Sequence, residues 1–309
     1  MKKSCLILLC FITLHFCQAQ RSEIGTMLGT SFYLGDLNSM PFRDAKFAGG
    51  IVYRYNFTPR WALKANILFG KIAASDANNH SILYDVIDEQ KVYKWDYRDR
   101  GLSFSSPITE ISAQVEINFF NVYNVSHKNH ISPYLFGGFA VFSFNPQANY
   151  TDPKTKITKT YDLQPIVTEW KLDEDVHTKY RLTGFAIPFG IGFKANIGRY
   201  VCVGAEWGLR FTFTDHLDDV SGRYLDVLPL KHTMSEDNFN VVAHFADPSA
   251  DLNANPIKRH TPGSQRYSTI KTDWYSFAGV IITVRIGNED RICDLKTNVK
   301  LKNKQGRKR

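Results

Sequence analysis

The residues best suited to chemistry form one short run, Asp215-His216-Leu217-Asp218-Asp219, at the end of a stretch of alternating apolar and polar residues. An aspartate beside a histidine on a loop can activate water for hydrolysis, because the two side chains can exchange a proton. The same residue types also suit a capped turn or an ion-binding loop, so these interpretations stay open. The candidate loop motif consists of Thr212, Thr214, Asp215, Asp218 and Asp219. A hydrolase would use Asp215, His216, Asp218 and Asp219.

Other catalytic and ligand-binding patterns are missing from the sequence. It contains neither G-x-S-x-G, which would place a serine nucleophile, nor the zinc-binding H-E-x-x-H. The two histidines of His127-Lys128-Asn129-His130 have no carboxylate beside them, which is typical of a solvated turn rather than a metal site. Cys202 and Cys293 are the only cysteines after residue 19, and no C-x-x-C pair occurs. The sequence therefore predicts a protein that is not an enzyme and that uses no cofactor or metal.

The first 19 residues have the features of an export signal. Lys2 and Lys3 precede a mostly apolar run over 5–16, and Cys17-Gln18-Ala19 supplies small residues where a signal peptidase cleaves. The alternative, a membrane anchor, needs about 20 apolar residues. We expect three parts: a signal peptide over 1–19, one domain over 20–287 and a basic tail over 288–309.

Charge is concentrated in that tail. The chain carries a formal net charge of +8, and residues 288–309 hold eight Lys or Arg against three Asp or Glu. The body is nearly neutral, so the sequence does not predict a nucleic-acid-binding groove. The tail has the composition of a disordered end, and it also suits a contact arm for an acidic partner or for anionic headgroups.

The elements that must position any site are strands, because apolar residues alternate with polar ones over most of the chain. In one stretch, Ile111, Val115 and Ile117 alternate with Glu110 and Glu116. This period of two is typical of strands with one apolar and one polar face. We predict a bulge at Pro188, because proline cannot donate to a sheet ladder. The eight predicted strands cover 23–35, 47–57, 61–69, 110–119, 133–144, 185–197, 200–214 and 272–286.

The connections between these strands alternate in length. Three are short, and four are longer and polar, at about 36–46, 72–107, 145–180 and 215–270. Long loops on one side and short turns on the other are typical of outer-membrane barrels, whose long loops face outward. A secreted β-sandwich is the alternative, but it does not explain polar residues along one face of nearly every strand. The sequence predicts an all-β protein: an antiparallel eight-stranded transmembrane β-barrel with long extracellular loops, in the outer membrane, with both termini in the periplasm.

An eight-stranded barrel has an interior that side chains fill, so inward-facing charges should pair with one another. We interpret these charges as structural plugs rather than as a selectivity filter. The candidate barrel-interior charges are Arg54, Lys64, Glu110, Glu116, Lys194, Glu206 and Arg210. Aromatic residues near the strand ends should form the two interfacial girdles: Tyr53, Tyr55, Phe57 and Trp61 on the short-turn side, and Phe211, Phe213 and Trp274 on the other.

Four segments resemble the PorG-type outer-membrane proteins of the type IX secretion system. They are EIGTMLGTSFYLGDLN at 23–38, YRYNFTPRWALKANILFGKI at 53–72, IPFGIGFKANI at 187–197 and EWGLRFTFTDHLDDVSGRY at 206–224. The resemblance implies an integral barrel, embedded in outer-membrane lipid, that contacts a periplasmic ring lipoprotein and other secretion-system components. It brings no catalytic residues with it.

The leading hypothesis is therefore a non-enzymatic outer-membrane anchor for protein secretion, whose periplasmic turns and tail dock a ring component. The second is a small-barrel channel or apolar-ligand transporter, which is porin-like and predicts conductance or solute uptake. The third is the loop-borne hydrolase described above.

Overall fold

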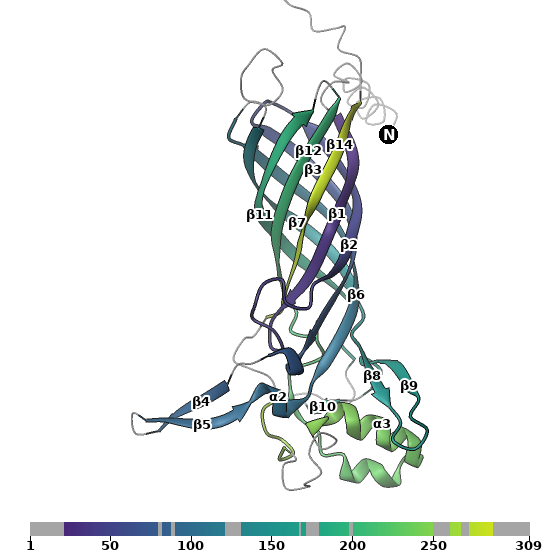
Figure 1. The fold of residues 1–309 in the computed structure, drawn as a ribbon. Coiled ribbons are helices and arrows are strands. Elements are labelled where there is room, and N and C mark those ends of the chain that lie inside the picture. Colours follow the sequence, from purple (N-terminus) through teal and green to yellow (C-terminus); the bar gives the residue numbers. More distant parts are fainter. Residues whose placement is uncertain are drawn as a thin grey trace, which may run out of the picture.

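The computed structural model describes residues 22–79, 82–87, 90–120, 131–166, 168–170, 179–197, 200–249, 260–266 and 272–286. Eight antiparallel strands hydrogen-bond in the order β3-β2-β1-β14-β12-β11-β7-β6, and β6 pairs back with β3, which closes the sheet (Figure 1). The predicted all-β fold, a closed antiparallel eight-stranded barrel, is confirmed. Its strands are β1 (Ser22–Leu34), β2 (Lys46–Asn56), β3 (Trp61–Ser75), β6 (Ser103–Asn118), β7 (Ile131–Phe144), β11 (Thr183–Ile197), β12 (Val201–Thr212) and β14 (Trp274–Ile286).

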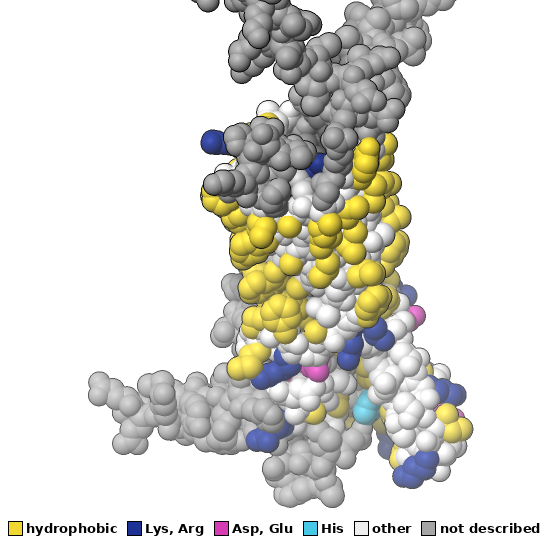
Figure 2. Space-filling view, turned by 45° about the horizontal axis from the view of Figure 1, so that its top comes forward, with side chains coloured by type: hydrophobic (Ala, Val, Ile, Leu, Met, Phe, Trp, Pro, Cys, Tyr) yellow, Lys and Arg dark blue, Asp and Glu magenta, His cyan; other side chains and the backbone are white. Residues whose placement is uncertain are grey.

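Alternate side chains along these strands face opposite sides of the wall. Outward side chains are apolar and exposed, as Phe47 (75%) and Phe139 (77%) illustrate. They form a continuous apolar belt on the face that Figure 2 shows. Inward side chains are buried, and they occupy every second position, as the period of two predicts. Since a closed sheet leaves no unpaired edge, this wall suits a lipid environment.

The two ends of the barrel differ. Short connections join β2 to β3 and β11 to β12 at one end, where the register sets Ser22 opposite Ile286. The connections at the other end are long and partly folded, and we call their described residues the cap (Figure 1). β3 runs to Ser75 and β6 begins at Ser103, so this pair continues well past the predicted ends of both strands, into the cap.

The cap contains short strands and helices. A hairpin of β4 and β5 projects to one side, and the β8–β9 hairpin lies near the helix α3 (Figure 1). The cap elements are η3 (Asp76–Asn78), β4 (Ile82–Ile87), β5 (Gln90–Asp96), α2 (Tyr97–Arg100), β8 (Gln147–Thr151), β9 (Thr158–Asp162), β10 (Glu169–Trp170), β13 (Arg223–Tyr224), η4 (Leu228–His232) and α3 (Glu236–Ala246). Among the described residues, no helix has the length and apolar character needed to cross a membrane.

One apolar core joins barrel and cap. Inward residues from the cap-side half of the barrel, such as Leu68 and Phe142, belong to the same buried cluster as Leu163, Leu217 and Phe245 of the cap. The cap therefore packs onto the barrel mouth with side chains that exclude water.

The predicted bulge at Pro188 is wrong. Ala186 lies opposite Ala140 and Phe189 opposite Gly137, so the β11–β7 register is the same on both sides of the proline. The pairing with β7 is interrupted at Ile187 and Pro188, while Pro188 still pairs with Arg210 of β12. A proline without N–H is accommodated by this local gap in one ladder, with no extra residue inserted.

Candidate functional site: barrel interior and mouth

The structure places all seven candidate interior charges inside the barrel. None is more than 5% exposed, and each lies on the face opposite the apolar belt. A further inward carboxylate, Glu23 at the start of β1, is also fully buried. With Glu23 included, these residues comprise four cations and four carboxylates, so their formal charges balance.

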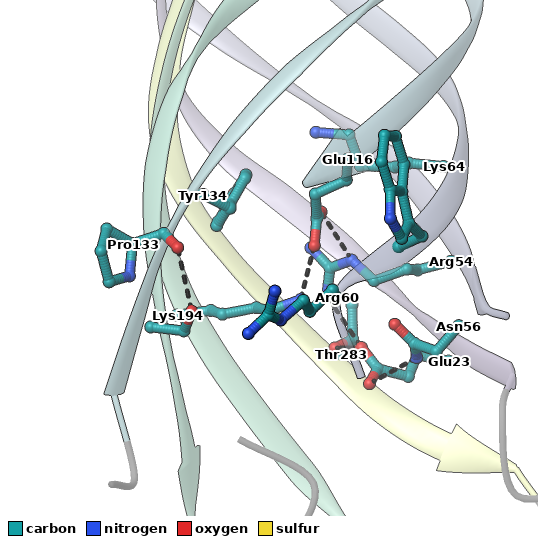
Figure 3. Close-up of polar contacts among 12 residues, drawn as sticks. Glu23, Arg54, Asn56, Arg60, Lys64, Glu116, Pro133, Tyr134, Lys194 and Thr283 are labelled. Atoms are coloured by element: carbon teal, nitrogen blue, oxygen red, sulfur yellow. Dashed lines mark hydrogen bonds and ion pairs between the residues drawn. The ribbon is translucent and has the colours of Figure 1, made fainter. Parts of the chain in front are cut away.

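Arg54 is the centre of the network nearest the short turns. Its guanidinium donates to Glu23 through Nη1 at 2.8 Å and to Glu116 through Nε at 3.0 Å (Figure 3). Lys194 donates to the other oxygen of Glu116 at 2.5 Å. Thr283 of β14 donates to Glu23 at 2.9 Å. Five barrel strands therefore contribute to this one network.

Two further carboxylates lie deeper along the barrel. Glu206 accepts from the Lys64 ammonium and, at 2.8 Å, from the Tyr134 hydroxyl. The Lys64 Nζ also lies 4.1 Å from the centre of the Phe136 ring, which provides a cation–π contact.

The fourth carboxylate, Glu110, accepts from Arg210 Nε and from the Tyr275 hydroxyl, both at 2.9 Å. The Arg210 guanidinium lies 4.8 Å from the centre of the Phe277 ring, where the apolar core begins. Because an eight-stranded barrel leaves little space, these paired side chains fill the lumen and act as a plug.

At the cap-side mouth, buried aspartates surround the hydroxyl of Tyr33. The Tyr33 Oη lies 2.6 Å from Asp218 Oδ2 and 2.7 Å from Asp273 Oδ1, and it accepts from the backbone N–H of Asp36 at 2.8 Å. All four side chains are at most 3% exposed. We call Tyr33, Asp36, Asp218 and Asp273 the acidic seal. It joins three chain segments that lie far apart in sequence.

The acidic seal requires a proton beyond that of the phenol. A tyrosine hydroxyl carries one proton and can donate to only one of the two carboxyl groups. The other must therefore donate its own proton to Oη. Burial raises the pKa of Asp218 well above its usual range, and the neighbouring Asp273 raises it further. Burial likewise raises the pKa of Asp273, which is consistent with a protonated carboxyl group in this cluster.

The remaining residues of the candidate loop motif divide between two places. Thr212 Oγ1 donates to the Asp273 carbonyl at 2.5 Å, and the Thr214 carbonyl accepts from the Asp273 N–H at 3.1 Å, so both fix the start of β14. Asp219 instead accepts from Thr168 at 2.6 Å and from Tyr180 at 2.7 Å.

Asp219 and Asp218 are both unsuited to a loop-borne hydrolase. Burial, followed by the nearby Glu169, raises the pKa of Asp219 to about 6. Asp218 and Asp219 are 2% and 5% exposed, so a substrate would not reach either carboxylate in this conformation. His216 Nδ1 lies 2.8 Å from Ser221 Oγ, and Glu169 accepts from that same serine. In a hydrolytic triad the histidine lies between the nucleophile and the acid. Here Ser221 lies between His216 and Glu169 instead.

Some predicted segments lie outside the described residues: the signal peptide over 1–19, the His127–His130 turn and the basic tail over 288–309. Asp215 is half-buried beside the acidic seal, where its charge acts on Asp273. Within the described ranges, no group of three or more His, Cys, Asp or Glu side chains is arranged to hold a metal ion.

Sequence reasoning missed Glu23, Tyr33 and Asp273. The alternation in the first strand could have identified Glu23, because it sits on the face opposite Ile24 and Leu28. Nothing in the sequence indicated the contact of Tyr33 with Asp273, since 240 residues separate them.

Comparison with known proteins gives one family and a set of barrels. The family model described as "Domain of unknown function (DUF6089)" matches residues 2–246. No curated protein matches the chain. Among solved structures, the chain is similar to the attachment invasion locus protein Ail of Yersinia pestis, with 8% identity, a TM-score of 0.34 and coverage of 85% of this chain and 97% of that one.

Two other solved barrels are similar to the same extent. Neisserial surface protein A has 7% identity and a TM-score of 0.39, with 86% of this chain and 97% of that chain covered. The N-terminal β-barrel domain of Pseudomonas aeruginosa OprF has 10% identity and a TM-score of 0.31, with 86% and 99% covered. TM-scores this low carry no inference about function, and the barrel is established by its own strand pairing.

Proposed function

The chain belongs to the DUF6089 family, and on that premise we propose that it is a non-enzymatic integral β-barrel of the outer membrane that serves as an anchor. An apolar belt encircles a closed sheet, which is the surface that a bilayer requires. The cap and the short-turn end then lie on opposite sides of the membrane. The long connections would face outward, and both ends of the barrel domain would face the periplasm.

The observation that carries this proposal is the filled interior. Four cations and four carboxylates, all nearly inaccessible to solvent, pair across the lumen from Glu23 to Arg210. A channel needs a wet passage, whereas these residues occupy the space through which an ion would move. An anchor needs only a stable barrel and surfaces at its two ends.

We propose further that the anchor serves the type IX protein secretion machinery. Support comes from the PorG-like segments, above all 53–72 and 206–224, which include Arg54, Lys64, Arg210 and the candidate loop motif. In this role the short turns and the tail contact a periplasmic ring lipoprotein, and the cap is available to other components of the machinery.

Conductance tests the anchor against the channel. Purified full-length protein in planar bilayers should show no ion conductance, and intact cells should take up small solutes at the same rate with and without it. Recovery in the outer-membrane fraction after carbonate washing checks the location. Steady single-channel currents from the wild-type barrel would overturn the anchor in favour of the porin-like alternative.

A pull-down tests the secretion role. A tagged protein from gently solubilised membranes should recover a ring lipoprotein, and a deletion strain should lose secreted cargo. A variant with Lys154, Lys159 and Lys231 replaced by Gln, all exposed in the cap, should still recover the lipoprotein, because this role places the lipoprotein at the opposite end of the barrel. Recovery of the barrel alone, with normal secretion in the deletion strain, would overturn this role and leave the anchor to be judged by conductance.

A further inference from the structure

The apolar belt ends at the cap side in a border of exposed cations. Lys71 is the next outward residue of β3 after exposed Phe69, and its backbone N–H and carbonyl hydrogen-bond to the Ser31 hydroxyl of β1. The β1–β2 register sets Ser31 opposite Lys46. Lys46 precedes Phe47 in the chain. Figure 2 shows Lys and Arg side chains gathered along this border of the belt. Lys46, Phe47 and Lys71 are all exposed where the apolar surface stops.

The connection between β1 and β2 adds a turn that folds back onto the belt. Phe42 has a left-handed backbone, with φ of 63°, and its ring centre lies 4.7 Å from that of Phe32 on β1 and 5.6 Å from that of Trp207 on β12. Phe32 faces outward yet is fully buried, whereas Phe42 is 50% exposed. The turn thus replaces Phe32 at the surface with a loop residue.

Arg43 follows Phe42 and carries the turn's positive charge. Its Nη2 contacts the Met40 sulfur, which is a weak acceptor. Within the described part of the chain, no ion pair joins Arg43, Lys46 or Lys71 to a carboxylate. Asp44 lies between the first two, and its Oδ1 accepts from Asn78 at 2.7 Å. The group keeps an excess of positive charge beside an apolar surface.

We propose that Arg43, Lys46 and Lys71 form a binding site for the phosphate of an anionic lipid, with Phe42 and Phe47 inserted among the acyl chains below it. Cations at an interface attract anionic headgroups by about 1 kcal/mol each. Aromatic side chains at the same level hold a barrel at a fixed depth. The phosphate belongs either to lipopolysaccharide or to an anionic phospholipid. This site rests on the membrane location within the proposed function, and it does not depend on the secretion role.

Lipid binding by the purified full-length protein tests the site. The test variant carries Arg43→Gln, Lys46→Gln and Lys71→Gln. The control carries Lys154→Gln, Lys159→Gln and Lys231→Gln, which removes the same charge from exposed cap positions. Each protein in neutral detergent is titrated with fluorescent lipopolysaccharide and, separately, with fluorescent phosphatidylglycerol. Heat-modifiable migration on gels confirms that each barrel is folded.

We expect the test variant to bind at least one of the two lipids at least about tenfold more weakly than wild type, with the control within about twofold. A loss confined to lipopolysaccharide assigns the site to that lipid, and an equal loss for both assigns it to any anionic headgroup. A loss confined to phosphatidylglycerol assigns it to phospholipid. Equal binding by wild type and the test variant, or an equal loss in the control, would overturn the site. Membrane fractionation reports on the location independently.

Discussion

The half of the barrel interior near the short turns is filled with paired charges, whereas the half near the cap is filled with aliphatic and aromatic side chains. Glu116 accepts from Arg54 and Lys194 in the first half. Leu68 and Phe142 lie in the core of the second. Both halves are almost inaccessible to solvent. They exclude water equally well, by different chemistry.

The difference shows what each half is suited to. Buried ion pairs contribute little net stability, because the desolvation of the charges offsets their attraction, but removing one partner is costly. Apolar packing contributes stability directly. The cap-side half can therefore stabilise the molecule and hold the cap, while the charged half fixes which strands meet and closes the lumen.

The largest expected effect comes from breaking the charged half. Glu116→Leu leaves Arg54 and Lys194 buried with one carboxylate fewer, and we expect a loss of about 3–5 kcal/mol in the free energy of unfolding. Urea unfolding in neutral detergent, followed by tryptophan fluorescence, measures it. A loss below about 1 kcal/mol would show that these cations reach water in the folded barrel.

A cavity in the apolar half should cost slightly less. Leu68 is 1% exposed, and Leu68→Ala should lower the free energy of unfolding by about 3 kcal/mol through lost packing. Its neighbour Ile67 faces outward and is 41% exposed, so Ile67→Ala is the control and should cost less than about 1 kcal/mol. Equal losses from both substitutions would mean that this half is not the apolar core.

The mouth should respond to pH, in contrast to the apolar core below it. The pKa of Asp219 is about 6 in the folded protein, against about 4 in an unfolded chain. Because folding raises this pKa, protonated Asp219 stabilises the folded protein. That stabilisation is complete below pH about 4 and is lost as pH rises through about 6. Between pH 4 and 7 the wild-type free energy of unfolding should fall by about 2 kcal/mol because of Asp219, and Asp219→Asn should remove this pH-dependent fall.

Unfolding curves for wild type and Asp219→Asn at several pH values measure that difference. Asp152→Asn, at a partly exposed hydrogen-bonded aspartate of the β8–β9 hairpin, is the control and should keep the wild-type pH profile between pH 5 and 7. Identical profiles for wild type and Asp219→Asn would contradict the prediction.

The smallest effect should come from a neutral side chain within the charged half. Gln114 lies on the same face of β6 as Glu116, and its carbonyl oxygen has no hydrogen-bond partner among the described residues. Gln114→Leu removes one hydrogen bond to Ser112 together with that unsatisfied atom. We expect a change of less than about 1 kcal/mol in the same unfolding assay. A loss as large as that of Glu116→Leu would contradict the prediction and show that Gln114 is as necessary as the ion pairs on either side of it.

The strands of the barrel could be predicted because the period of two is a local property. Ile111 and Glu116 follow the alternation and face the expected sides. Phe32 shows where that reasoning stops: it faces outward, as the alternation along β1 requires, but Phe42 covers it, and no periodicity indicates a turn that folds back. The prediction of a bulge at Pro188 was wrong, because a proline can interrupt the hydrogen bonds to one neighbouring strand without shifting the register.

The cap and the acidic seal could not be predicted for a related reason. Strands β8 and β9 and helix α3 are short and lie in long polar connections, where local patterns are weak. The acidic seal depends on contacts between Tyr33, Asp218 and Asp273, and only the closed barrel brings these together. The sequence identified Asp218 as unusual, but not its partners.

The seam between the first and last strands has a consequence for biogenesis. Glu23 receives hydrogen bonds from Arg54 and Asn56 on one side and from Thr283 on the other. Since Thr283 belongs to the barrel strand that comes last in chain order, a chain that is truncated or stalled before it leaves this carboxylate incompletely satisfied in an open sheet. We expect closure to act as an all-or-none proofreading step, so that partial barrels remain targets for proteolysis.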